Sequence, residues 1–352
     1  MSRTRAGSGR VTLRDIASAV GVTPAAVSMA LRGSNRIGKD TTERIQVAAR
    51  ELGYVTNSAG RALRAQRSGS IALVVPNTSQ HVFGHPYFMH LLVGVSEVSD
   101  SRGAPVIIST SVESEHGINA YERLLRSQVA DGAIVASAAA QDRDLESLVA
   151  SGLPVVLIGR SVTLPDAVWV GVDDVAGGEL ATRHMIEEHG ARRVVHLSGP
   201  LEHQSALDRL DGCRRALAAA GLPEPRVIQG DFSEDSGVAA ARELLDQGLD
   251  ADAIVVANDE MAYGLMRTLA DAGIRVPDDV GLIGFDDFGL ARVTTPGIST
   301  IRVPAELIGG RAASELFGLL DGDEPAERHV VLPVQLVVRG SCGCPLSAHD
   351  KN

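Results

Sequence analysis

Four short polar clusters, each at the end of an apolar run, are the residues best suited to bind or transform a small molecule. They are Asp173-Asp174, Ser198-Gly199-Pro200, Asn258-Asp259 and Asp286-Asp287. Carboxylate, amide and hydroxyl groups bind the hydroxyls of a polar ligand, and adjacent carboxylates can also serve in acid–base catalysis. The spacing therefore indicates a site for a polar small molecule.

Two other interpretations of these clusters stay open. An Asp or Asn that follows a strand often caps the next helix by accepting hydrogen bonds from its first amides. Alternatively, Asp286 and Asp287 are the paired carboxylates of an enzyme, for example one that acts on phosphorylated sugars. No P-loop, His-plus-carboxylate metal set or nucleophile elbow accompanies them, so we expect no enzymatic activity.

Aromatic residues form only 3% of the chain, which draws attention to three of them. Tyr87 and Phe88 follow Pro86, and Phe232 follows Gly230-Asp231. These side chains either stack on a ligand or pack in a core.

The elements that must position these residues are short β-branched apolar runs that alternate with helical segments. The runs are 71–75, 105–108, 133–136 and 155–158 in one group, and 194–197, 253–256 and 281–285 in another. Continuous apolar strands separated by helices predict parallel, doubly wound α/β sheets covered on both faces. Two groups of strands predict two lobes, and ligands bind such sheets beyond the carboxyl ends of the strands.

The N-terminal region has a different pattern, typical of three short helices. Leu13, Ile16, Ala17 and Val20 share one helical face, and Gly21 allows a turn. Thr23-Pro24 is a strong helix start, so a second helix is expected from Pro24 to about Arg32. A third helix, 39–52, carries Ile45, Ala48, Ala49 and Leu52 at core spacing. The first two helices match a helix-turn-helix, whose second helix enters the major groove of DNA.

The charge distribution supports DNA binding by this region. The first 68 residues hold twelve Lys and Arg against four Asp and Glu, whereas the chain as a whole has a net charge of −11. A basic N-terminal region suits phosphate binding, and the acidic remainder of the chain disfavours DNA binding through any other face.

Length and composition predict a folded, cytoplasmic protein. The 352 residues allow two or three domains, and the 44% apolar content is ample for a core. No apolar run is long enough for a membrane span, and the N-terminus lacks the apolar stretch of a signal peptide. Three cysteines are too few and too badly spaced for a disulfide framework or a four-ligand zinc site; Cys342-Gly-Cys344 either binds a metal, senses redox state or is incidental. We expect no cofactor and no metal.

The segment 56–70 is basic and compatible with a helix but has few apolar anchors. An isolated helix of this length is marginal in water, so the segment is expected to fold on DNA and to melt without it.

Taken together, the helix-turn-helix, linker and two-lobed body resemble the lactose-repressor and galactose-repressor family of bacterial transcription regulators over nearly the full length. The motifs that carry the resemblance are Thr12 to Ala17, Val27-Ser28, Glu51 to Tyr54, Asn258 to Gly264, Val276 to Val280, Gly284 to Asp287 and Arg339-Gly340-Ser341. The resemblance implies a DNA-binding homodimer with a type I periplasmic-binding-protein-like body that closes around a small effector.

The resemblance also assigns DNA-binding positions. It implies phosphate contacts for Thr12, Arg14, Thr23, Ser28 and Arg36, and major-groove positions for Pro24, Ala25, Ala26 and Met29. Relatives tend to have a polar residue near Ala26 and an Arg at Met29. Ala and Met contact thymine methyls at most, so base readout is expected to shift to Arg32 and to the hinge.

In the hinge, Asn57 and Leu63 match the family's hinge helix, in which the leucine wedges into the minor groove. Thr56 stands where many relatives have proline, and Gly60 where they have alanine.

For the effector, the resemblance implies six residues. Tyr87 and Phe88 match an aromatic pair, Phe232 matches a stacking aromatic, Arg209 matches an anchoring arginine, and Asn258 and Asp286 match side chains that bind ligand hydroxyls. His85 stands where relatives often have Asn. Aromatic faces with a guanidinium, an amide and a carboxylate suit a sugar.

We therefore expect a repressor of genes for carbohydrate uptake or catabolism that is controlled by a sugar. Its expected partner is double-stranded operator DNA, and its expected location is the cytoplasm, in association with the nucleoid. We expect no membrane association. A corepressor-dependent regulator that responds to a nucleobase or another metabolite is the alternative, and a sugar-binding or sugar-processing protein is less favoured. The expected domains are 1–55 (helix-turn-helix), 56–68 (hinge), 69–345 (effector binding and dimerisation) and 346–352 (tail). Within the third, 69–172 with 303–332 form the N-lobe, and 173–302 with 333–345 form the C-lobe.

Overall fold

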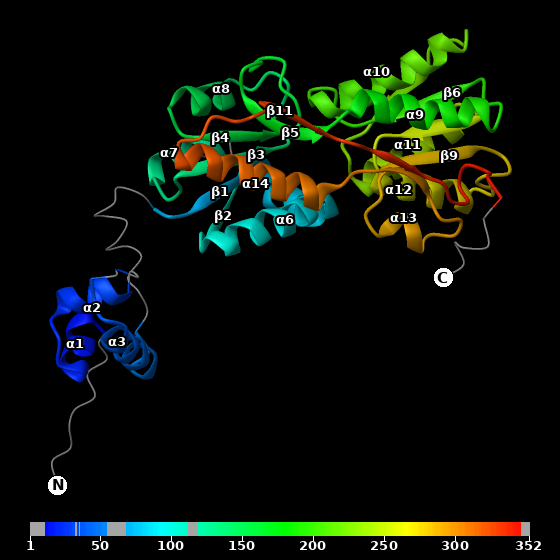
Figure 1. Ribbon diagram of the computed structural model, residues 1–352. Helices are drawn as coiled ribbons and strands as arrows, with labels where there is room; N and C mark the ends of the chain where they lie inside the picture. The colour runs from blue at the N-terminus through cyan, green and yellow to red at the C-terminus, as the bar shows by residue number, and fades with distance from the viewer. Residues whose placement is uncertain (1–10, 32–33, 35, 55–67, 112–118, 346–352) are drawn as a thin grey trace. The chain divides into compact units, whose positions relative to one another are not determined.

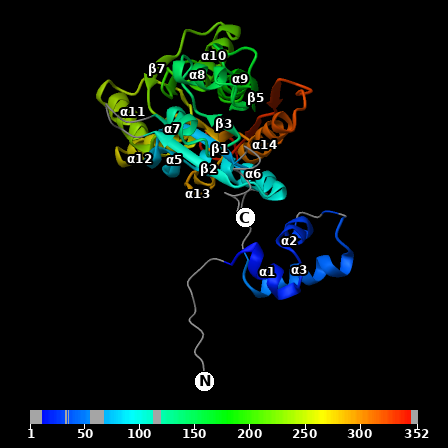
Figure 2. The same ribbon diagram turned by 90° about the vertical axis from the view of Figure 1, so that its left-hand side faces the viewer.

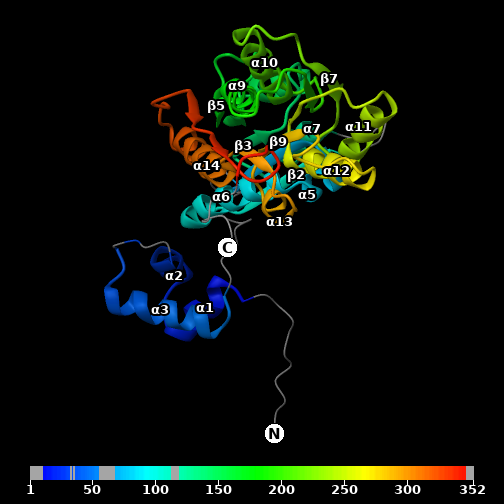
Figure 3. The same ribbon diagram turned by 90° about the vertical axis from the view of Figure 1, so that its right-hand side faces the viewer.

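The computed structural model describes residues 11–31, 34, 36–54, 68–111 and 119–345, in two compact units, 1–67 and 68–352. Arg32, Asn57 and Leu63, three of the predicted DNA-binding residues, lie outside the described residues. Figure 1 labels most of the elements of both units, and Figures 2 and 3 show the units from two other sides.

The first unit contains three helices around a small apolar core. They are α1 (Leu13–Val20), α2 (Pro24–Leu31) and α3 (Lys39–Glu51). The Thr23 hydroxyl accepts a hydrogen bond from the Ala26 amide at 3.2 Å, which confirms the predicted start of α2. Ile16, Val27 and Ile45 are fully buried in the core, and Gly21, with φ 75°, makes the turn between α1 and α2. The predicted helix-turn-helix is thus present.

The prediction of one core residue in this unit, Leu52, is wrong. Leu52 is 40% exposed, because α3 ends at Glu51 and Gly53 turns the chain with φ 68°. Tyr54, beyond the turn, packs on the core instead.

The second unit contains two six-stranded sheets. The first has the order β11-β5-β4-β3-β1-β2 and consists of β1 (Ile71–Thr78), β2 (Val106–Ser111), β3 (Gly132–Ala136), β4 (Val155–Ile158), β5 (Val168–Val172) and β11 (His329–Leu332). Its strands all pair in parallel, with Ile71 in register with both Val106 and Gly132. We call this sheet and its helices the first lobe.

The second sheet repeats this topology, with the order β12-β10-β9-β8-β6-β7. It consists of β6 (Val194–Ser198), β7 (Arg226–Gln229), β8 (Ala253–Val256), β9 (Gly281–Asp286), β10 (Ser299–Arg302) and β12 (Gln335–Val337). Only β12, at the edge, is antiparallel among the described pairings. We call this sheet and its helices the second lobe. The seven apolar runs all lie in strands except for Pro105, one residue before β2, so the predicted parallel α/β architecture is confirmed.

Helices cover the sheets of both lobes. They are α5 (Ser79–Gly84), α6 (Pro86–Arg102), α7 (Ala120–Ser127), α8 (Arg143–Ala150) and α14 (Ala305–Asp321) in the first, and α9 (Asp174–Glu187), α10 (Gln204–Ala219), α11 (Glu234–Asp246), α12 (Asp259–Asp271) and α13 (Leu290–Val293) in the second. In Figure 1, α6 and α14 lie side by side, as do α9 and α10. The second pair touches backbone to backbone, since a Cβ on Gly178 would lie 2.2 Å from the Arg209 carbonyl oxygen. Within the described residues, no helix has the length and apolar character needed to cross a bilayer.

Candidate functional site

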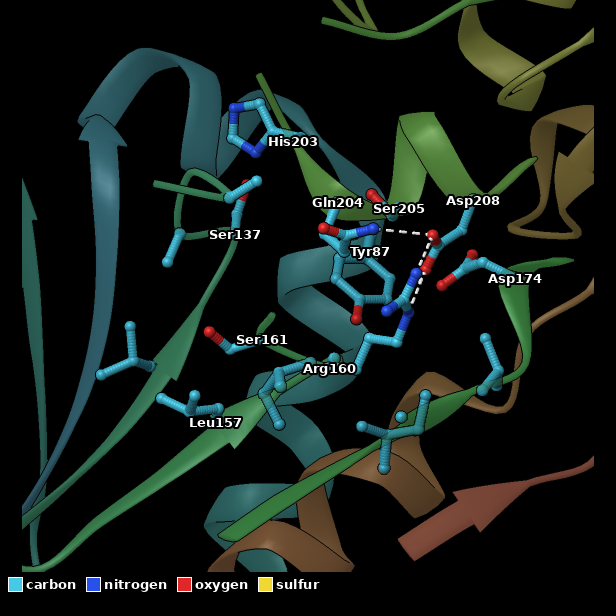
Figure 4. Close-up of a pocket in the computed structure, with 18 of the residues that line it drawn as sticks. Tyr87, Ser137, Leu157, Arg160, Ser161, Asp174, His203, Gln204, Ser205 and Asp208 are labelled. Carbon is cyan, nitrogen blue, oxygen red and sulfur yellow. Dashed lines mark hydrogen bonds and ion pairs between the residues drawn. The ribbon is translucent and has the colours of Figure 1, made fainter. Parts of the chain in front are cut away.

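A cleft between the two lobes is lined by the carboxyl ends of strands from both sheets. In the first lobe, the lining consists of residues after β3 and β4, such as Ser137 and Arg160, and of Tyr87 at the start of α6. In the second lobe, the lining consists of Asp174, the start of α10 and Asp286. Figure 4 shows the polar side chains of α10 facing those of the first lobe. This is the edge at which doubly wound sheets bind ligands.

Of the six predicted effector residues, five line this cleft. They are Tyr87, Phe88, Phe232, Arg209 and Asp286. Asn258 is not in the lining: its side chain caps α12 by accepting from the Met261 amide at 3.0 Å. Its amide nitrogen donates to the Phe232 carbonyl at 2.8 Å. Contact of any of the six with a ligand stays a prediction.

Arg209 organises the floor of the cleft. It is 8% exposed, and its guanidinium donates to the Asp174 carboxylate at 2.8 Å and to the Ala257 carbonyl at 2.5 Å. It also lies 3.6 Å from the Asp286 carboxylate and 3.8 Å above the Phe285 ring. Burial raises the pKa of Asp174, and raises that of Asp286 well above its usual range, although Arg209 opposes both shifts. The cleft floor is therefore a buried guanidinium between two aspartate side chains.

An ion pair that the sequence analysis missed joins the two lobes. Arg160, directly after β4, donates through Nε to Asp208 of α10 at 2.6 Å and through Nη2 to the other oxygen. Gln204, one helical turn earlier, donates to the same carboxylate at 2.7 Å (Figure 4). The position of Gly159-Arg160 at the end of an apolar run was the sequence signal for Arg160, but nothing in the sequence indicates its partner.

A second polar contact between the lobes involves His85, Asn258 and Glu260. His85 Nε2 lies 3.1 Å from the Asn258 amide nitrogen and 3.7 Å from Glu260, which itself accepts from Asn258 at 2.9 Å. Burial, with His81 and Arg209 nearby, lowers the pKa of His85 to about 4, so this imidazole is neutral near pH 7. Burial raises the pKa of Glu260 to about 7.

Glu260 predicts a pH dependence of stability. Because its folded pKa of about 7 exceeds its ordinary value of 4.5, Glu260 contributes stability that is present at low pH and lost as the pH rises through 7. We therefore expect Glu260→Gln to raise the free energy of unfolding, relative to the unchanged protein, by on the order of 2 kcal/mol at about pH 8 and by little at about pH 5. Urea unfolding at the two pH values measures this.

The matched control is Glu97→Gln, at an exposed position of α6, which should change neither value. His85 has the opposite pH dependence, because its contribution to stability is lost as the pH falls through about 4. Wild type and Glu260→Gln both contain His85, so its contribution cancels in the comparison. A Glu260→Gln effect of equal size at both pH values would contradict a raised pKa.

Strained backbone conformations gather at the cleft. Five non-glycine residues among those described have positive φ, and Ser137, Phe232 and Asp286 of these line the cleft, with φ of 59°, 69° and 110°. Such conformations cost about 1–3 kcal/mol each and persist where the surrounding structure fixes them, often at ligand sites.

Other members of the four polar clusters have structural partners. Asp173 caps α9 by accepting from the Ala176 amide at 2.9 Å. The Asp287 carboxylate accepts from Arg302 at 2.7 Å and from Arg339 at 2.5 Å. Asp286 lines the cleft and Asp287 does not, so the structure does not bring the two side chains together there.

The nine predicted DNA-binding residues that the structure describes lie on the surface of the first unit or partly within it. Thr12, Arg14, Thr23, Pro24, Ala25 and Arg36 are exposed, and Ala26, Ser28 and Met29 are partly buried. Val27 and Ala30 of α2 are buried in the core and Leu31 packs against it, whereas Pro24 and Ala25 at the start of α2 are exposed. Contact of the predicted residues with DNA stays a prediction.

Comparison with known proteins gave matches over nearly the whole chain. Residues 12–57 match the model of bacterial regulatory proteins, lacI family, and residues 182–342 match a periplasmic binding protein-like domain. The chain is 36% identical to the HTH-type transcriptional regulator CelR of Thermobifida fusca, covering 94% of this chain and 98% of that one.

Two solved structures are similar as well. A transcriptional regulator CelR–cellobiose complex has a TM-score of 0.73 and 35% identity, covering 94% of this chain and 100% of the other. The lac repressor dimer bound to operator and an anti-inducer has a TM-score of 0.82 and 26% identity, covering 95% and 99%.

Proposed function

The chain belongs to the lacI family of bacterial transcriptional regulators, and from this premise we propose that it represses genes for carbohydrate uptake or catabolism under the control of a sugar bound in the cleft. It acts in the cytoplasm as a homodimer on an approximately palindromic operator. The helix-turn-helix of the first unit binds DNA, and the second unit binds the effector.

The observation that carries the sugar proposal is the chemistry of the cleft lining. Tyr87, Phe88 and Phe232 supply aromatic groups, which suit the C–H faces of a pyranose. Arg160, Gln204 and Asp208 supply a charged donor, an amide and a carboxylate for hydroxyls. The cellobiose complex of a relative that is 35% identical supports the same class of ligand.

The cleft offers a physical route from ligand to DNA. A ligand that contacts both lobes changes the balance between lobe arrangements only if its affinity for them differs. In the cleft, the Arg160–Asp208 ion pair lies between the lobes, so a bound sugar either leaves this pair intact and adds its own contacts, or breaks the pair and takes its place. The first lobe begins where Asp131 accepts from the Ser68 and Gly69 amides at 2.6 and 2.8 Å, at the end of the predicted hinge segment. A coupling of about 1–3 kcal/mol between sugar and operator is typical for such regulators.

Titration calorimetry of the full-length protein tests the effector proposal. We expect saturable binding of at least one sugar in a panel containing cellobiose, ribose, glucose, galactose and lactose, with none of the sugar consumed. Asp286→Asn, which alters a buried lining group without changing its size, should abolish the binding, whereas Asp271→Asn, at an exposed position of α12, should not.

Two results would contradict the proposal. Binding of a nucleobase with no sugar bound would favour the corepressor alternative, and turnover of a sugar would favour an enzyme.

A further inference from the structure

Four side chains that commonly bind metals meet at one place in the second lobe. They are His184 in the last turn of α9, His189 just beyond it, and Cys342 and Cys344 after β12. One nitrogen or sulfur atom from each lies within 4.8 Å of all the others. Cys344 Sγ is 3.3 Å from His189 Nε2 and 3.6 Å from His184 Nε2.

These distances suit a tetrahedral ion. Zinc binds thiolate sulfur at about 2.3 Å and imidazole nitrogen at about 2.0–2.1 Å, so a sulfur and a nitrogen on one tetrahedral Zn²⁺ lie about 3.5 Å apart. The two measured S–N distances bracket this value. The two imidazole rings are not stacked but meet at 74°, with centroids 5.1 Å apart. We propose that His184, His189, Cys342 and Cys344 form a structural Zn²⁺ site.

Hydrogen bonds within the fold hold the cysteine segment of this site in place independently of a metal. The Ser341 hydroxyl donates to the Leu282 carbonyl at 2.7 Å and accepts from the Ser299 amide at 2.8 Å, which fixes the cysteine segment to β9 and β10. Gly343, between the two cysteines, has φ 102°, and a Cβ there would lie 3.3 Å from the His189 ring. Glycine thus permits both the turn and the approach of the histidine.

The site is separate from the effector cleft. It lies toward the C-terminal end of α9, whereas Asp174 at the N-terminus of the same helix lies in the cleft. His184 lies ten residues after Asp174, which corresponds to about 15 Å of helix. A bound zinc would cross-link α9 to the segment after β12, so the site stabilises the second lobe and does not touch the sugar.

Zinc content measured on the untagged full-length protein tests the site. After dialysis against zinc and then against buffer, we expect one zinc per chain by mass spectrometry. Cys344→Ser, at a partly buried position, should lose most of it, and Cys213→Ser should keep it, because Cys213 is a buried thiol in α10 outside the cluster. Cobalt should give the intense visible absorption of a tetrahedral thiolate site in the unchanged protein and lose it in Cys344→Ser.

Thermal unfolding supplies a readout that does not depend on a variant. A strong chelator should lower the melting temperature of the second unit by several degrees, and added zinc should restore it. A wild-type protein without zinc after dialysis, a disulfide between Cys342 and Cys344 in place of the metal, or zinc retained by Cys344→Ser would overturn the proposal.

Discussion

Replacing Arg209 with Ala is expected to lower the free energy of unfolding by about 3–5 kcal/mol, because removing one partner of a buried ion pair leaves uncompensated charge. Arg209 is buried between Asp174 and Asp286 and also donates to the Ala257 carbonyl. Denaturant unfolding measures the effect. Arg214→Ala is the matched control: it lies on the same helix, and its ion pair with Glu224 is exposed, so a change within about 0.5 kcal/mol is expected. A similarly small change for Arg209→Ala would contradict the buried network.

Arg209→Lys separates stability from ligand binding. Lysine keeps the positive charge between the two carboxylates but lacks the planar guanidinium that also reaches Ala257 and covers Phe285. We expect a protein that folds but binds the effector at least about tenfold more weakly. An unchanged response of operator binding to the effector would exclude Arg209 from the effector site.

Arg14→Glu is expected to weaken operator binding more than tenfold and random-duplex binding in proportion, since the loss of a phosphate contact acts on every sequence. Arg14 is exposed in the first turn of α1, where an acidic residue favours the helix, so folding should be unaffected. Affinity measured at several salt concentrations should also show a smaller salt dependence. Arg242→Glu, exposed in α11 of the second unit, makes the same change in net charge and should leave DNA binding nearly unchanged. Equal effects of the two reversals would remove Arg14 from the DNA-binding surface.

Local patterns predicted much of the fold. Thr23-Pro24 predicted the start of α2, and the seven apolar runs predicted seven strands, because helix capping and runs of apolar residues are visible in a sequence. β10 leaves no such mark. Its Ser299 and Thr300 are polar yet fully buried, and Thr300 donates to Asp259 at the start of α12 at 2.8 Å. A buried polar strand depends on partners distant in the sequence, which periodicity does not reveal. The prediction that Leu52 is a core residue was wrong for another reason, because α3 ends at Glu51, one residue before it.

The candidate site was predicted in part for the same reason. Residues at or just after strand ends converge on one edge of each sheet, which brings Phe232 and Asp286 into the cleft lining, and Arg209 reaches the same lining from α10. The Arg160–Asp208 pair depends on how the two lobes face each other, and Asn258 is occupied as a helix cap. The zinc cluster was missed because only the cysteines were counted. His184 and His189 are distant in the sequence from Cys342 and Cys344, and only the fold brings the four together.

The most direct test of the central claim is operator affinity measured with and without sugar. Fluorescence anisotropy with promoter DNA from beside the protein's own gene, compared with random duplex of equal length, measures both specificity and coupling. The account predicts a clear preference for one promoter fragment and a change of about 5- to 150-fold in its affinity when the effector binds, absent in Asp286→Asn. Equal affinity for every duplex at moderate salt, unaltered by any sugar, would contradict it.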